Sequence, residues 1–141
     1  MIRCTVESVR VHEETQQHMV NLRDAEGTVM PIWIGPDTAF AIQSALAGTQ
    51  SERPLTHDLL LSAFEKLGVR VARAAITGFV PFDDPTKPGG VFHATLYCER
   101  GAERFELDSR PSDAIAIAVR TGAVIDVDDA IFAKSAVKRG A

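Results

Sequence analysis

The sequence has little of what several common protein classes require. Only two of its 141 residues are cysteines, so a disulfide framework of the kind found in small secreted domains is excluded. The N-terminal segment lacks an apolar stretch of signal-peptide length, and no run approaches the ~20 apolar residues of a membrane-spanning helix. These absences predict a cytoplasmic protein without a membrane partner.

Several well-known catalytic signatures are also missing. The chain has no P-loop, no G-x-G-x-x-G, no C-x-x-C, no H-E-x-x-H and no G-x-S-x-G pattern. The common nucleotide hydrolases and dehydrogenases are therefore excluded, and no organic cofactor is expected. The formal net charge of −4 offers no general attraction for nucleic acid, so a polyanion would need a local basic patch.

What is present is an ordinary globular composition. Hydrophobic residues make up 45% and charged residues 24% of the chain. A length of 141 residues suits a single domain, here residues 1–141, which buries roughly 70% of the surface that the unfolded chain exposes. Cys4 and Cys98 each lie on the apolar face of a predicted strand, which favours buried, reduced thiols over the alternative of a disulfide or a metal pair.

Hydrophobic periodicity predicts both strands and helices. Alternating apolar residues predict strands over 2–11, 18–23, 29–34, 69–80, 91–99, 104–108 and 124–127. Apolar residues at helical spacing predict helices over 36–47, 57–67, 111–121 and 128–137, the second of them capped by Thr56. Pro31 removes a hydrogen-bond donor from its strand, so it should lie at a sheet edge or at a bulge. Trp33 points away from the apolar face of the same strand, where it can stack on a base or pack in a dimer interface.

The element order indicates an internal duplication. Three strands followed by two helices occur twice, in repeats of about 1–68 and 69–137. The repeats share a pattern 75 positions apart, since Pro36, Ala39, Ala41 and Ile42 recur as Pro111, Ala114, Ala116 and Ile117. The predicted fold class is α+β, with a duplicated unit of three strands and two helices that forms one mixed, curled sheet flanked by helices.

The segment 106–122 is the strongest candidate for chemistry. It places Asp108, Arg110, Ser112 and Asp113 around the predicted turn from a strand into a helix that starts at Pro111. Free N–H groups at such a helix start bind anions such as phosphate, and two converging carboxylates can hold Mg²⁺ or Mn²⁺. The structural alternative is that Asp113 caps the helix and Arg110 pairs with Asp108.

A second candidate lies in residues 53–58, R-P-L-T-H-D. Histidine titrates near neutral pH and carboxylates are hard metal ligands, so His57 and Asp58 suit acid–base or metal chemistry. Neighbouring helical residues point about 100° apart, however, which opposes one shared ion. The structural alternative is helix capping by Thr56 and Asp58.

Four segments together resemble the bifunctional nuclease domain family. They are M-P-I-W-I-G-P (30–36), R-P-L-T-H-D-L-L (53–60), V-F-H-A-T-L (91–96) and L-D-S-R-P-S-D-A-I-A-I-A (107–118). The resemblance spans residues 2–135 and implies a barrel-like sheet, a homodimer and hydrolysis of both DNA and RNA. The residues that match the family's motifs are Arg53, Thr56, His57, Asp58, Asp108, Arg110, Ser112 and Asp113.

The leading hypothesis is a homodimeric, metal-assisted nuclease. Its predicted catalytic residues are Asp108, Asp113 and His57, and its predicted metal ligands, for Mg²⁺ or Mn²⁺, are Asp108, Asp113 and Asp58. Arg110, Ser112 and Arg53 are predicted to contact the substrate phosphate. The alternative is a non-catalytic dimeric module that recognises a partner protein or a small anionic ligand, with the same side chains serving as caps and ion pairs.

Overall fold

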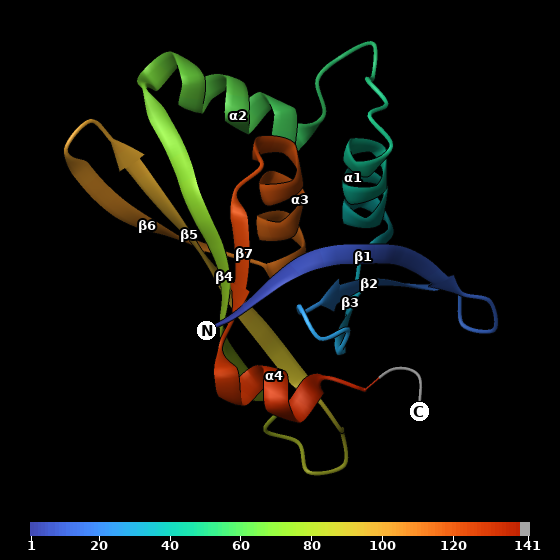
Figure 1. Cartoon of the computed structure of the whole chain (residues 1–141). Coiled ribbons are helices and arrows are strands. Elements are labelled where there is room, and N and C mark those ends of the chain that lie inside the picture. The colour runs from blue at the N-terminus through green and yellow to red at the C-terminus, as the bar shows by residue number, and fades with distance from the viewer. Residues whose placement is uncertain (139–141) are drawn as a thin grey trace.

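The computed structural model describes residues 1–138 and shows a mixed α+β protein (Figure 1). A seven-stranded sheet carries helices packed on it, which confirms the predicted class. The strands are β1 (Ile2–His12), β2 (Gln17–Arg23), β3 (Val29–Ile34), β4 (Val69–Pro81), β5 (Gly90–Arg100), β6 (Glu103–Ser109) and β7 (Val124–Val127). The helices are α1 (Pro36–Leu46), α2 (Thr56–Leu67), α3 (Pro111–Thr121) and α4 (Asp129–Ser135).

The sheet is open, with strand order β3-β2-β1-β7-β4-β5-β6. Neighbouring strands are antiparallel except β4 and β7, which are parallel. The edge strands β3 and β6 do not pair with each other in the described chain, so the predicted barrel-like closure is not confirmed. The prediction of an edge position for the strand that contains Pro31 is confirmed, since β3 ends the sheet.

Strand β7 joins the two predicted repeats. Three strands and two helices follow one another twice, with β7 inserted between α3 and α4. β7 pairs with β1 from the first repeat and with β4 from the second. The repeats meet at Gly68, whose φ of 74° ends α2 in a left-handed conformation that favours glycine. The element order agrees with a duplication, which itself stays a prediction.

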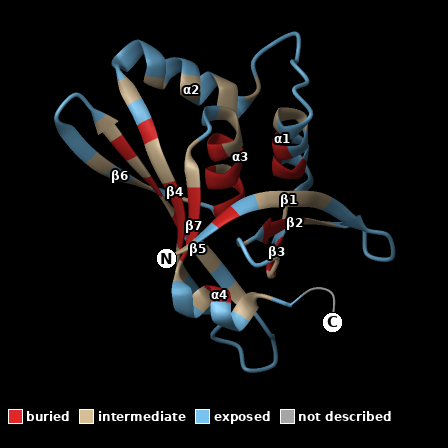
Figure 2. Ribbon diagram, in the orientation of Figure 1, coloured by how far each residue is buried: buried red, intermediate tan, exposed pale blue. Residues whose placement is uncertain are grey.

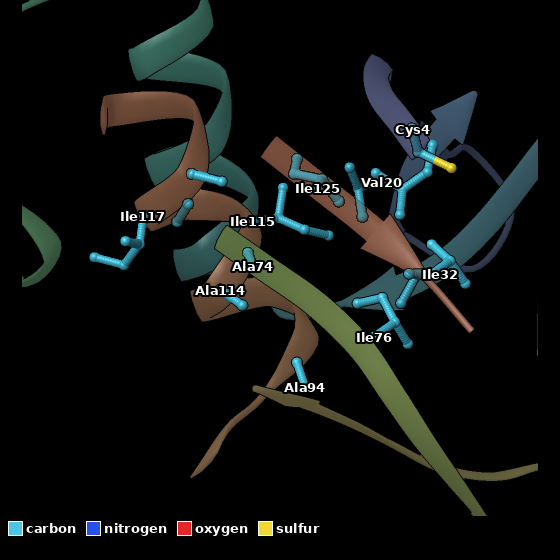
Figure 3. Close-up of a cluster of buried hydrophobic side chains, with 14 of the residues drawn as sticks. Cys4, Val20, Ile32, Ala74, Ile76, Ala94, Ala114, Ile115, Ile117 and Ile125 are labelled. Atoms are coloured by element: carbon cyan, nitrogen blue, oxygen red, sulfur yellow. The ribbon is translucent and has the colours of Figure 1, made fainter. Parts of the chain in front are cut away.

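Helices α1 and α3 lie side by side on one face of the sheet (Figure 1). The A-I-A-I-A run of α3 is at most 1% exposed, because its small alanines let neighbouring backbones approach while its isoleucines fill the space between. Figure 3 shows Ile115 and Ile117 of α3 in this core, with Ile125 of β7 and Ile76 of β4 nearby. Buried residues gather where the sheet meets α1 and α3 (Figure 2). The core therefore fixes both helix starts against the sheet.

Several helix boundaries differ slightly from the sequence-based expectation, and those of α2 and α4 have a clear cause in side-chain hydrogen bonds. Helix α2 begins at Thr56 and is capped by Leu55, because the Asp58 carboxylate accepts the Leu55 N–H at 3.0 Å and draws the helix start one residue earlier. The prediction of Thr56 as the cap is wrong. Helix α4 is shorter than predicted and starts after Asp128, whose side chain accepts the N–H groups of Ala130 and Ile131.

A charged network ties the two halves of the sheet together. Asp126 of β7 is buried, and its carboxylate accepts hydrogen bonds from Arg3 of β1 at 2.6 Å and Arg73 of β4 at 3.2 Å. Burial raises the pKa of Asp126, but the two guanidinium groups outweigh that effect and hold it below its usual range. The Arg73 guanidinium also lies 4.2 Å from the centre of the Tyr97 ring.

The remaining predictions about the described residues concern the cysteines and the membrane. Cys4 and Cys98 are buried and free, as predicted. Burial raises the pKa of the Cys4 thiol to about 11, which keeps it protonated and unreactive near neutral pH. Within residues 1–138, no helix has the length and apolarity needed to cross a membrane.

Candidate active site

The start of α3 forms a sharp corner after β6. Ser109 ends the strand, Arg110 is the extended N-cap and Pro111 takes the first helical position, where its missing N–H leaves no bond unmade. The first intrahelical bond is donated by Ala114 to the Arg110 carbonyl. The side chains of Arg110 and Asp113 therefore stand one helical turn apart at the positive end of α3.

Asp113 is held by two cationic or polar groups. Its Oδ2 accepts the Arg110 Nε–H at 2.6 Å, and its Oδ1 accepts a second Arg110 bond from Nη2 at 3.1 Å. His57 Nε2, from the start of α2, lies 2.9 Å from the same Oδ1. Residues 56 positions apart in sequence thus meet at one carboxylate. The alternative predicted for Arg110 is wrong, since its carboxylate partner is Asp113 rather than Asp108.

The electrostatics fix the proton on His57. Burial raises the pKa of Asp113, but the hydrogen bonds from Arg110 and His57 outweigh that effect and keep it below its usual range. An ionised carboxylate only accepts hydrogen bonds, so Nε2 must carry a proton. In the neutral imidazole Nδ1 is then the basic nitrogen. Nδ1 has no partner among the described residues and is not a buried unsatisfied atom, so it reaches solvent.

A second ion pair fixes α2 against α3. Asp58 Oδ1 accepts the Arg120 Nε–H at 2.8 Å, and Arg120 Nη1 donates to the carbonyls of Ala41 in α1 at 2.9 Å and Ala116 at 3.1 Å. The Arg120 side chain is only 9% exposed. The bond from Arg120 holds the pKa of Asp58 below its usual range. His57 and Asp58 therefore bind α3 at Asp113 and Arg120, which are seven residues apart on one face of the helix.

The structure does not bring Asp108 to this corner. Asp108 stands opposite Thr95 in register and alternates with Leu107, whose side chain packs on the core. Successive strand residues point to opposite faces, so Asp108 lies on the face away from α3, where it is exposed. Arg53 is exposed in the α1–α2 connection, and its side chain makes no hydrogen bond or ion pair with a described residue.

The predicted metal ligands therefore do not form a ready-made site. Within residues 1–138, no group of three or more His, Cys, Asp or Glu side chains is placed to hold an ion. The Asp113 oxygens are engaged by Arg110 and His57, and those of Asp58 by Arg120 and the Leu55 N–H. As placed, these donors do not fit Mg²⁺ or Mn²⁺, which need oxygen ligands around one point.

Ser112 lies beside a cavity of about 550 Å³ between the two halves of the molecule. The wall includes Trp33 and His18 from the first half and Phe92, Arg110 and Ser112 from the second. Both proline-started helices begin at this wall, since Gly35 and Pro36 also line it. The corners that precede α1 and α3 thus share one hollow.

Sequence reasoning overlooked Arg120. Arg120 lies in the last turn of α3, where a basic residue is explained by the helix dipole alone and so indicates no further role. The one available signal is its spacing, because Asp113 and Arg120 are two helical turns apart and share a face. That spacing does not reveal the α2 side chains opposite, which only the tertiary fold supplies.

Acid pH is expected to destabilise the contact between α2 and α3. Asp58 and Asp113 both have lowered pKa values in the folded protein, so their contribution is complete above the unfolded carboxyl pKa of about 4. It is lost as the pH falls through the lower folded-state values, where the unfolded chain has already gained its protons. Urea unfolding at several pH values below about 5 should show this loss, with a shallower slope for Asp58→Asn. An equal slope in wild type and variant would contradict it.

Comparisons of the sequence show which known proteins this chain is similar to. The family model described as the bifunctional nuclease domain matches residues 20–140 of this chain. An uncharacterized protein found in two strains of Mycobacterium tuberculosis is 34% identical over 131 residues, which is 92% of this chain and 73% of the mycobacterial protein. Bifunctional nuclease 2 of Arabidopsis thaliana is 26% identical over 113 residues, which is 78% of this chain and 32% of the plant protein.

Proposed function

The chain belongs to the bifunctional nuclease domain family, and on that premise we propose that it hydrolyses phosphodiester bonds in DNA and RNA at the corner formed by His57, Arg110 and Asp113. The observation that carries this proposal is the 2.9 Å contact between His57 and Asp113. It joins the two motifs that the sequence singled out, and it gives a histidine an ionised orienting partner.

In this proposal His57 is the general base. Nδ1 takes a proton from a water molecule as the water oxygen bonds to phosphorus, and the bond from phosphorus to the leaving oxygen breaks. The leaving alkoxide takes a proton from solvent. Asp113 holds the imidazole with Nε2 protonated and stabilises the imidazolium that forms. Water as the nucleophile needs no ribose 2′-hydroxyl, so one site can act on both DNA and RNA.

Arg110 and the start of α3 stabilise the charge on the phosphate. The Arg110 side chain is 66% exposed even though it pairs with Asp113, so its guanidinium remains accessible to a phosphate oxygen. The N–H groups of Ser112 and Asp113 have no acceptor in the described chain and lie at the positive end of the helix dipole. Arg53, exposed near the start of α2, is proposed as a further phosphate contact.

A divalent metal ion stays a separate proposal. Asp108 is exposed and has no side-chain partner in residues 1–138, so it is free to bind Mg²⁺ or Mn²⁺ at the other sheet face. No step of the reaction above passes through such an ion, because Asp58 and Asp113 are already committed to other groups.

The proposed active unit is a homodimer. Helix α2 has no fully buried residue, and Leu59 and Leu67 are 64% and 57% exposed, although Leu61 and Phe64 pack on the core. Exposed leucines on a helix beside the candidate site suit an interface between two copies.

One observation favours a second function, a non-catalytic binding module. Asp58 and Asp113 are both held in ion pairs, as a structural network requires, and the Arg120 side chain is buried. A network of this kind would present the α3 start as a fixed binding corner for an anionic group without hydrolysing it. Cleavage assays separate the two functions.

The purified protein is expected to cut both plasmid DNA and a labelled RNA. The assay compares Mg²⁺, Mn²⁺ and EDTA. The His57 mechanism predicts full activity in EDTA, whereas loss of cleavage in EDTA would show that a metal ion takes part in the reaction and would contradict a metal-free step. Failure to cut either substrate under any of these conditions would contradict the nuclease proposal and favour the binding module.

A further inference from the structure

The Ser112 side chain lines the cavity between β3, β5 and the starts of α1 and α3, and it has no hydrogen-bond partner among the described residues. The residue is 7% exposed, and its hydroxyl makes no hydrogen bond to any described residue. The hydroxyl is not a buried unsatisfied atom, so the surface that it retains opens into the cavity that Ser112 lines. A nearly buried hydroxyl without a partner is costly unless a water or a ligand completes it.

The starts of α1 and α3 both reach this wall, through Pro36 and Pro111. The first intrahelical bonds are donated by Ala39 in α1 and Ala114 in α3, which leaves the N–H groups of Asp37, Thr38, Ser112 and Asp113 without acceptors in the described chain. Of these four residues, Ser112 lines the cavity. Both helices are 11 residues long and begin with proline. Among the residues that line the cavity, Arg110 is the one with a permanent charge. This end of the cavity therefore suits an anion, and a phosphate group in particular.

The other end of the cavity is aromatic. Trp33 is 56% exposed on the edge strand, and its one ring contact in the described chain is a T-shaped contact with His12, with the ring centres 6.4 Å apart. No aromatic ring of the described residues is stacked parallel to its indole. Phe92 lines the cavity from β5 and is supported by Phe79 at 4.8 Å. A flat aromatic base can stack on such a surface.

We propose that this cavity binds one nucleotide of a single-stranded nucleic acid, with the base on Trp33 and a phosphate at Ser112 and Arg110. The inference rests on the proposed function and names the preferred substrate as a single strand. A base in a duplex is stacked on both faces and cannot present one to Trp33, whereas a single strand can. The volume of about 550 Å³ lies within the range of small-molecule sites.

Tryptophan fluorescence reports directly on binding at Trp33, because Trp33 is the only tryptophan in the chain. A thymidylate strand of about twelve nucleotides, within the usual site sizes, is titrated into wild-type protein in EDTA, and the strand is checked for intactness afterwards. We expect saturable quenching of the tryptophan fluorescence. The same strand in a duplex with its complement should bind at least about fivefold more weakly.

Affinities are then compared by fluorescence anisotropy of the labelled strand. Trp33→Ala should weaken binding at least about fivefold, the usual loss for one stacked base. Ser112→Ala should weaken it about tenfold without lowering the melting temperature, because the lost hydroxyl has no partner inside the protein. The matched control is Phe40→Ala, which removes an aromatic that is 59% exposed on α1 and does not line the cavity.

The outcomes separate this inference from the nuclease proposal. Binding with quenching by a protein that cuts nothing supports the nucleotide site and ends the nuclease proposal. Cleavage by a protein whose Trp33 fluorescence does not change on binding supports the nuclease proposal and ends the proposal of a nucleotide site at Trp33. No binding, equal affinities in wild type and both variants, or an equal loss in Phe40→Ala would overturn the inference. So would a fall in molecular mass on Trp33→Ala with no quenching in wild type, which would place Trp33 in a subunit interface.

Discussion

Asp113→Asn is expected to cut DNA and RNA at least about a hundredfold more slowly than the wild-type protein. The carboxylate holds His57 in the tautomer with a basic Nδ1, and an amide can instead donate to Nε2 and select the opposite tautomer. With the amide nitrogen at the Oδ1 position, the Arg110 Nη2 bond is also lost, and the bond that remains from Nε is no longer made to a charged carboxylate, so Arg110 is held more weakly at the helix start. Initial rates on plasmid DNA and on a labelled RNA, with thermal melts of both proteins, measure the effect.

One matched carboxylate serves as a control for this prediction, and a second tests the role of Asp108. Asp83→Asn changes an exposed aspartate in the β4–β5 loop and should leave the rate unchanged, which also tests for contaminating nuclease in the preparation. Asp108→Asn separates the two views of the site, because the sequence predicts a catalytic role for Asp108 while the fold places it on the other sheet face. A folded Asp113→Asn protein that cuts at the wild-type rate would remove His57 and Asp113 from the chemistry.

A double variant adds a further check on the same pair. If His57 and Asp113 act as a unit, His57→Ala combined with Asp113→Asn should be little slower than either single variant, since each change alone already removes the oriented base. Multiplicative losses would mean that the two side chains act independently, contrary to the hydrogen bond between them.

The sequence was informative wherever the physics is local. The proline at the start of α1 and α3 and the edge position of β3 follow from backbone constraints on one or two residues, and the structure confirms both. The motif at 107–118 was located for the same reason, because a strand followed by a proline-started helix is a local pattern.

Contacts between distant segments were beyond that reasoning. Strand alternation puts Asp108 and Leu107 on opposite faces, but only the fold shows that the Leu107 face is the one that α3 covers. Gly35 and Pro36, which precede and start α1, border the same cavity as Arg110. They are about 75 positions from Arg110 in sequence, so only the tertiary fold brings them together.

Arg120 and Arg110 differ in burial, so the same substitution is expected to affect them in different ways. Arg120→Met is expected to lower the free energy of unfolding by about 3 kcal/mol, because it leaves the Ala41 carbonyl without its donor and Asp58 without its cation. For a domain of this size that loss corresponds to a fall of about 10 °C in melting temperature. Methionine keeps most of the apolar stem, so the loss reports on the guanidinium rather than on packing. Urea titration and thermal melts of the purified variants measure it.

Substitution of Arg110 by methionine should instead lower the cleavage rate and leave the melting temperature nearly unchanged. The Arg110 side chain is 66% exposed against 9% for Arg120, and an exposed ion pair contributes at most about 1 kcal/mol. Arg110→Met should therefore melt close to wild type while its cleavage rate falls, whereas Arg120→Met should melt early and, at temperatures where it is folded, retain cleavage. If Arg110→Met lost stability and kept activity, the corner would be a structural clamp. Both motifs would then serve to fix α2 on α3, and the binding module would be the better description.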